Sequence, residues 1–476
     1  MSVVACADVG STYTKVAVVD AGDGRLVATA AHPTTVPDVM TGLGAAVRAA
    51  TAGLRAASIP WYVCSSAGGG LRLAVVGFER LVTAEAGHRV GLSAGARVVH
   101  VAAGPLDAAG VRDLRAARPD VVLLAGGTDG GDAEVLVHNA RRLARSRWRV
   151  PVVVAGNADA AGEVGAVLGG ASIVDNVLPR IGVLRAGPAR AAIREVFLRH
   201  VIGGRFGARF ARLVRAATPD AVLAGVELLA DRTGRGLLVV DVGGATTDVY
   251  SALPPGAERP AEAAGTLPRA RTVEGDLGVR WSAPGVVAAA AAEKLPHDAA
   301  LAEAARLRAA DPALIGDSTL SAESTPAGDP TSAGDPSLSG GSALTGRSSL
   351  TGGSALSGGS ALSRGSAAGV DLRLATIAAT VAVRRHARGE AGGFGRRDLR
   401  EVSVVVGSGG VLRHSPAGDA RGVLDAVLSD HGGGWPLPRA AATVVDRECV
   451  LAAAGLLAAD HPAAAFALLH DHLCGG

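Results

Sequence analysis

Two glycine-rich turns, far apart in the chain, each follow a strand-like run that ends in an aspartate. They occupy residues 8–15 (Asp-Val-Gly-Ser-Thr-Tyr-Thr-Lys) and 241–248 (Asp-Val-Gly-Gly-Ala-Thr-Thr-Asp). Glycine lets the backbone turn closely, so that successive N–H groups converge on one anion. Asp8 and Asp241 would repel a phosphate unless they hold Mg²⁺, directly or through its waters. The two turns therefore predict a two-sided clamp for a magnesium nucleotide.

The residues expected to contact phosphate are the glycines, hydroxyls and lysine of these turns, which could donate N–H or O–H groups to its oxygens. They are Gly10, Ser11, Thr12, Lys15, Gly243, Gly244, Thr246 and Thr247. Lys15 could equally be an ordinary surface lysine. Asp248 could orient the two threonines or simply end the turn.

A third glycine turn, at residues 404–411 (Val-Val-Val-Gly-Ser-Gly-Gly-Val), has no carboxylate. Bare glycines after a hydrophobic strand let a flat group lie against the backbone, which suits an adenosine. We therefore expect Gly407, Ser408, Gly409 and Gly410 to bind the nucleoside. One glycine turn is weak evidence because such turns are common, but three in this order are stronger.

Other familiar nucleotide and metal motifs are missing. The chain has two lysines, and neither completes a G-x-x-x-x-G-K loop. No G-x-G-x-x-G follows a strand-like run, there is no H-E-x-x-H, and the four cysteines form no C-x-x-C. A single G-x-S-x-G match at Gly91–Gly95 has its strand-like run after the serine instead of before it, so we interpret it as a chance match.

The elements that must position the turns follow an α/β pattern. Strand-like runs at residues 3–7, 14–19 and 26–30 predict an antiparallel meander around the first turn. Runs at residues 237–241 and 246–251 predict the same hairpin around the second turn. Between them, strand-like runs such as Val121–Ala125 precede glycine loops and helical stretches, which is typical of βα units.

Composition excludes several classes of protein. The 476 residues are 48% hydrophobic and 19% charged, with a net charge of +3, which excludes a fully disordered chain and a strongly basic nucleic-acid binder. Apolar runs such as Val450–Ala459 reach only half of the ~20 residues that a membrane helix needs. With no signal-like start and few cysteines, we expect a soluble cytoplasmic protein with neither membrane nor nucleic-acid partners.

One segment differs from the rest of the chain. Asp317–Gly369 consists mainly of Ser, Gly, Ala, Leu, Thr and Pro and repeats Ala-Gly-Asp-Pro and Ser-Ala-Leu. Such a composition cannot bury enough apolar surface to offset its ordering entropy. We expect a disordered linker that loops out and leaves the clamp intact.

The three turns in this order resemble the actin-like ATPase superfamily. The resemblance implies a two-lobed, ribonuclease H-like α/β fold with lobes at residues 1–230, including an inserted α/β region, and 231–476. It implies that the turns are phosphate motif one, phosphate motif two and the adenosine motif, with ATP and Mg²⁺ as ligands. Gly225 and Gly455 would allow close crossing of the connecting helices, matched by Ala221–Ala230 and Cys449–Ala459.

A narrower resemblance covers most of the chain. It is to the GlmL/MutL-type accessory proteins encoded beside adenosylcobalamin-dependent glutamate mutase and related aminomutases. The segments that carry it are 8–15, 123–132, 176–182, 188–201, 241–251, 271–283 and 407–414. The resemblance implies an ATPase that lets a mutase exchange damaged cobalamin, with mutase subunits as partners and a homo-oligomer left open. Asp8 or Asp241 would orient the attacking water and hold the metal. The chain lacks D-x-H-x-x-G, so it is not expected to carry cobalamin itself.

Other functions on the same fold stay open. A small-molecule kinase would need a carboxylate base beside an acceptor pocket, which the sequence does not identify. A non-catalytic actin-like scaffold or filament is a second alternative. The activators of radical dehydratases share the D-x-G-S-T-x-x-K start, but they carry an iron–sulfur cluster for which these scattered cysteines offer little.

Two further segments have open roles. The loop Gly126–Asp132 could bind an anion at a helix N-terminus, but a tight turn capped by Asp132 is favoured. Arg280 and Trp281 could contact a partner, whereas a core position is favoured for the tryptophan.

Overall fold

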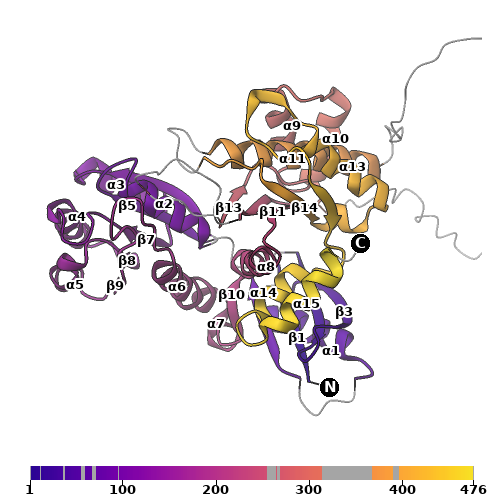
Figure 1. Ribbon diagram of the computed structural model, residues 1–476, viewed down its shortest axis with the longest axis horizontal. Helices are drawn as coiled ribbons and strands as arrows, with labels where there is room; N and C mark the ends of the chain where they lie inside the picture. Colours follow the sequence, from indigo (N-terminus) through magenta and orange to yellow (C-terminus); the bar gives the residue numbers. More distant parts are fainter. Residues whose placement is uncertain are drawn as a thin grey trace, which may run out of the picture.

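The computed structural model describes residues 2–10, 12–35, 38–54, 59–66, 71–94, 96–254, 264, 269–312, 367–389 and 396–474. The expected disordered linker lies outside these residues except for its last three positions, which belong to a helix, α11 (Ala367–Arg388). Ser11 also lies outside them. Within the described residues the strands form three five-stranded sheets (Figure 1). No helix in this part of the chain is both long and apolar enough to span a bilayer.

The first sheet has the strand order β10-β4-β1-β2-β3. Three strands form the predicted antiparallel meander: β1 (Val3–Val9), β2 (Tyr13–Asp20) and β3 (Leu26–Pro33). Two more lie parallel to β1 on its other side: β4 (Trp61–Ser65) and β10 (Val214–Ala217). The buried side of β1 packs against α1 (Val39–Thr51). The first glycine turn therefore joins the two central strands.

The second sheet repeats this arrangement, with the order β13-β12-β11-β14-β15. Its antiparallel strands are β11 (Gly236–Val242), β12 (Thr247–Ala252) and β13 (Arg269–Glu274), which confirms the second predicted hairpin. The parallel strands are β14 (Val402–Ser408) and β15 (Ala442–Val445). Its core includes residues of α9 (Ala283–Ala292), α10 (Ala299–Ala310), α11 and α13 (Ala417–Leu428). Strand order and direction match the first sheet position by position.

A third sheet is inserted between β4 and β10. Its strands are all parallel and have the order β6-β5-β7-β8-β9. They are β5 (Arg72–Gly77), β6 (Arg97–Ala103), β7 (Val121–Leu124), β8 (Val152–Val154) and β9 (Ser172–Ile173). The helices are α2 (Thr83–Ser93), α3 (Ala108–Ala116), α4 (Glu134–Arg145), α5 (Ala161–Leu168) and α6 (Gly187–Val196), which runs on through a π-helical segment to α7 (Gly203–Ala211). The sheet is doubly wound, with α2 and α6 on one face and α3–α5 on the other. Ser93 ends α2 and precedes β6, which confirms that the G-x-S-x-G match is a coincidence.

The two similar sheets are joined by crossing helices. Residues of both sheets share one core with α8 (Thr218–Thr233), α14 (Val450–Leu457) and α15 (Pro462–Leu473), which lie between them in Figure 1. A Cβ on Gly225 would lie 2.5 Å from the Leu451 carbonyl oxygen, and one on Gly455 would lie 1.8 Å from that of Ala221. The prediction that these glycines permit a close crossing is confirmed.

Candidate nucleotide site between the two similar sheets

The first two glycine turns have the same local geometry. The Gly10 N–H donates to the Tyr13 carbonyl at 3.0 Å, and the Gly243 N–H donates to the Thr246 carbonyl at 2.9 Å. A Cβ on either glycine would lie 2.8 Å from that same carbonyl oxygen. The flanking strands pair Asp8 with Lys15 and Asp241 with Asp248. The two turns, which share Asp-Val-Gly and a later threonine, therefore have the same backbone hydrogen bond.

Both turns are supported through their carbonyl groups. In the second turn, the carbonyls of residues 243–245 accept hydrogen bonds from Val279 N, Arg280 N and Ser282 Oγ at 2.7–3.1 Å. In the first turn, Thr34 donates from Oγ1 to Gly10 and from its N–H to Thr12. By contrast, the N–H groups of residues 244–246 have no hydrogen-bond partner in the part of the chain that the structure describes. We call these three free N–H groups the nest, because unpaired N–H groups of a turn are able to donate to an anion.

The hydroxyls of the second turn point in different directions. Thr246 Oγ1 donates to Asp248 Oδ2 at 3.2 Å, and Asp248 is held in turn by the buried guanidinium of Arg271. Asp248 therefore orients one of the two threonines. Thr247 is fully buried, and its hydroxyl donates to the Leu277 carbonyl at 2.5 Å, away from the nest. Thr12, in the first turn, is exposed.

The two aspartates have different surroundings. Asp8 Oδ1 accepts hydrogen bonds from Thr218 Oγ1 at 2.5 Å and from Cys64 Sγ at 3.7 Å, and Asp8 Oδ2 lies 3.8 Å from the Lys15 ammonium. Asp241 accepts no hydrogen bond from a described residue, and burial raises its pKa. Asp8 is thus fixed by neighbours, whereas Asp241 keeps its oxygens available for a ligand.

Charges of the first turn act on the aspartate of the second turn. The charges of Lys15 and Asp8 both act on the Asp241 carboxylate, although each lies on the other sheet. Burial acts to lower the pKa of Lys15, but the charge of Asp8 and the smaller effects of Cys449 and Asp241 together outweigh it, so the pKa is raised. The Lys15 side chain is about one-third exposed, and its ammonium lies 3.8 Å from Asp8 Oδ2, which holds it beside the first turn.

The third turn lies beside the second. Ser408 is buried and stands opposite Asp241 in the parallel pairing of β14 with β11. Gly409 has a φ of +105°, and a Cβ there would lie 2.1 Å from the Val242 carbonyl oxygen. Gly407 is packed against leucines, whereas a Cβ on Gly410 would meet nothing within 4 Å. The third turn therefore packs tightly on one side and is open on the other.

Several neighbours of the site were missed by sequence reasoning. Arg413, in α12 (Gly410–His414), acts electrostatically on Asp241, Lys15 and Asp446. Asp446 is buried and caps α14 by accepting from the N–H groups of its first two residues at 2.9 and 3.2 Å. The signal available for Arg413 was its place six residues after Gly407, but no spacing rule assigns that position a role.

The two segments with open roles are now placed. Asp132 Oδ1 accepts from the Glu134 N–H at 2.6 Å, which agrees with the favoured reading of a capped turn. The core position favoured for Trp281 is wrong, because this side chain is 59% exposed. The Arg280 guanidinium forms a bidentate ion pair with the Asp371 carboxylate, whereas the neighbouring Trp281 side chain faces outward.

The carboxylates of Asp8 and Asp241 suit a magnesium ion only if a bound ligand supplies further oxygen donors. Among the described residues, no group of three or more His, Cys, Asp or Glu side chains could hold a metal alone. Asp8 and Asp241 supply two hard oxygen donors. Mg²⁺ is commonly bound by one or two carboxylates together with waters and substrate phosphates. The donor set therefore fits a magnesium nucleotide better than a free ion.

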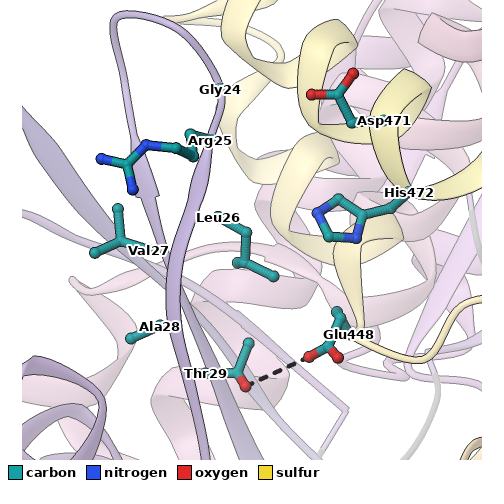
Figure 2. Close-up of a pocket in the computed structure, with 9 residues that line it drawn as sticks. All are labelled: Gly24, Arg25, Leu26, Val27, Ala28, Thr29, Glu448, Asp471 and His472. Atoms are coloured by element: carbon teal, nitrogen blue, oxygen red, sulfur yellow. Dashed lines mark hydrogen bonds between the residues drawn. The ribbon is translucent and has the colours of Figure 1, made fainter. Parts of the chain in front are cut away.

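A separate hollow of about 380 Å³ lies along β3 (Figure 2). It is lined by residues 24–29, Glu448, Asp471 and His472, and the Thr29 hydroxyl reaches Glu448 at 3.5 Å. None of the three turns contributes to it. We therefore assign the nucleotide chemistry to the turns and not to this hollow.

The two matching sheets each have a glycine turn after the aspartate of the central strand, and crossing helices join them. This arrangement defines an actin-like ATPase fold, which is a nucleotide-binding fold. The chain belongs to the MutL protein family, whose family model matches residues 4–325 and 363–473. It is 38% identical over 307 residues to Protein MutL of Clostridium tetanomorphum. That match covers 60% of this chain and 66% of the relative, slightly less than two thirds of its length.

The likenesses to solved structures are more distant. A glycerol dehydratase reactivase has a TM-score of 0.32 at 14% identity, covering 96% of this chain and 99% of its own. A ROK family glucokinase from Streptomyces griseus, in complex with glucose and AMPPNP, has a TM-score of 0.30 at 14% identity, covering 97% and 98%. At TM-scores this low, these likenesses add nothing to the argument from strand order.

Proposed function

We propose that this chain is an ATP-binding, slowly ATP-hydrolysing accessory protein that reactivates an adenosylcobalamin-dependent mutase of the glutamate mutase kind. The observation that carries the ATPase part is the duplicated turn, which follows Asp8 in one sheet and Asp241 in the other, with the charge of Asp8 acting on Asp241. Membership of the MutL family supports the mutase as partner. We expect the protein to act in the cytoplasm.

Each part of the site has a role in this proposal. Phosphate oxygens are held by the N–H groups of the first two turns, together with Ser11, Thr12 and Thr246, and the adenosine lies on the open side of Gly410. Asp8 and Asp241 would hold Mg²⁺, which would neutralise charge on the phosphates. Asp241 is the better candidate to orient the attacking water, because no described residue donates a hydrogen bond to it.

The crossing of α8 and α14 would let nucleotide state change the shape of the protein. ATP that contacts turns on both sheets draws them together, and hydrolysis releases them. The inserted domain would sense this movement, because α2 packs against β13 and Arg97 lies 3.1 Å from a Cβ position on Gly275, just after that strand. A slow cycle of this kind suits a protein that remodels a partner.

The first test is ATP hydrolysis by the purified chain with Mg²⁺ and no added acceptor. We expect slow release of phosphate that needs the metal. Phosphate transfer only in the presence of a small-molecule acceptor would instead identify a kinase. ATP-dependent sedimentation of large assemblies without hydrolysis would identify a filament or scaffold. Either of these results would overturn the ATPase assignment.

A further inference from the structure

Arg413 has a fixed position next to the third turn. Its N–H donates to the Gly409 carbonyl at 3.0 Å, and its own carbonyl accepts from Arg447 Nη1 at 2.7 Å. These bonds hold the backbone of Arg413 just after the glycines expected to carry the nucleoside. The start of the side chain is therefore placed by the same turn that would place the ligand.

The guanidinium of Arg413 has a buried hydrogen-bond donor that is not satisfied by the described residues. Its Nε is buried without a hydrogen-bond partner in the described part of the chain, and it makes no ion pair there. By contrast, Arg271 pairs with Asp248, and Arg384 pairs with Asp430. A buried polar group without a partner is costly, so in folded proteins such groups commonly await a ligand or water.

The charge of Arg413 acts on both sides of the site. It lies close enough to influence Asp241 and Asp446 on the second sheet and Lys15 on the first. Arg413 and Lys15 are like charges that repel each other, and Lys15 is already paired with Asp8. An anion between the two cations would relieve this repulsion and supply the missing partner of Arg413.

We propose that Arg413 binds the phosphate groups of the nucleotide, opposite Lys15. This inference rests on the proposed function and deepens it, because it names a side chain that binds the negatively charged phosphates of the ligand. Arginine suits this task because its planar guanidinium donates two parallel hydrogen bonds to phosphate. A polyphosphate held by cations from both sheets draws them together, so binding strengthens with the number of phosphates, from adenosine through ADP to ATP.

The test compares R413A and R413Q with the wild type by calorimetric titration of ATP, ADP and adenosine. We expect both variants to bind ATP about tenfold to a hundredfold more weakly, as for a lost hydrogen bond to a charged group, with adenosine affinity unchanged. R413K, which keeps the charge, should recover part of the loss. The matched control is R421A, an exposed arginine of α13, which should bind all three ligands as the wild type does.

Wild-type ATP affinity in R413A and R413Q would overturn the inference. Equal loss of ATP and adenosine affinity would also overturn it, since that result indicates damage to the turn itself. Circular dichroism and thermal melting of each variant show whether it is folded. If R413A is not folded, the comparison uses R413Q, which keeps a polar side chain. A wild-type chain that binds neither ATP nor adenosine would refute the proposed function, an outcome distinct from a failure confined to Arg413.

Discussion

Asp241→Ala is expected to lower ATP hydrolysis by at least about a hundredfold while the protein stays folded. Asp241 ends the strand before the second turn, the charges of Lys15 and Asp8 on the first sheet act on its carboxylate, and no described residue donates a hydrogen bond to it. Its removal takes away a metal ligand or the group that orients water. It breaks no internal bond, and burial already disfavours the charged form, as the raised pKa indicates.

Steady-state phosphate release checks this expectation, with thermal melting as the test of folding. Asp241→Asn, which keeps the size of the side chain, should be equally impaired. Asp425→Ala removes an exposed carboxylate of α13 and should retain full activity. Full hydrolysis by Asp241→Ala would show that the site has been assigned to the wrong residues.

Gly455→Ala is expected to lower the free energy of unfolding by about 1–3 kcal/mol, the usual cost of overpacking a tight contact. A methyl group there would lie 1.8 Å from the Ala221 carbonyl oxygen. That atom belongs to the backbone of α8, so it can move only if the two helices separate. The strain must also outweigh the gain of up to ~1 kcal/mol that alanine brings to a helix.

The control for this prediction is Gly422→Ala on α13, where a Cβ would meet nothing within 4 Å. Chemical denaturation should show Gly422→Ala to be as stable as the wild type or slightly more so. Because the crossing also joins the two sheets of the site, Gly455→Ala should hydrolyse ATP more slowly. If both variants unfold at the same denaturant concentration, the close crossing does not constrain the protein in solution.

The local architecture around the turns was accessible from sequence because its signals are local. Runs of alternating or continuous apolar residues that end in aspartate and glycine specify a strand and the turn after it. The two near-copies of this pattern fold into turns with matching hydrogen bonds at Gly10 and Gly243. The glycines of the helix crossing were predicted differently, from the resemblance to the actin-like ATPase superfamily, which implied which helices meet.

The direction of individual side chains was not predictable in this way. Thr246 and Thr247 are neighbours with the same side chain, yet one hydroxyl bonds Asp248 and the other bonds the distant Leu277. The partner of Asp8 is Thr218, which is 210 residues away in sequence. Trp281 was misjudged because its exposure depends on Arg280 turning toward Asp371. Such contacts depend on the packing of separate elements, which local patterns do not encode.

The inserted domain shows the same limit on a larger scale. Its strands β7 and β8 were expected from apolar runs before glycine loops, but their place in one all-parallel sheet was not. Strand order depends on which helix covers which face. Here α2 lies on the face shared with α6 and also reaches β13 of the second sheet.

The central claim is tested most directly by measuring the recovery of an inactivated mutase. A glutamate mutase that holds damaged cobalamin would be incubated with fresh adenosylcobalamin, Mg²⁺ and ATP, with the wild-type chain, with Asp241→Ala or with neither. We predict that mutase activity returns only with the wild-type chain and hydrolysable ATP. Equal recovery without the chain, or with Asp241→Ala, would contradict it.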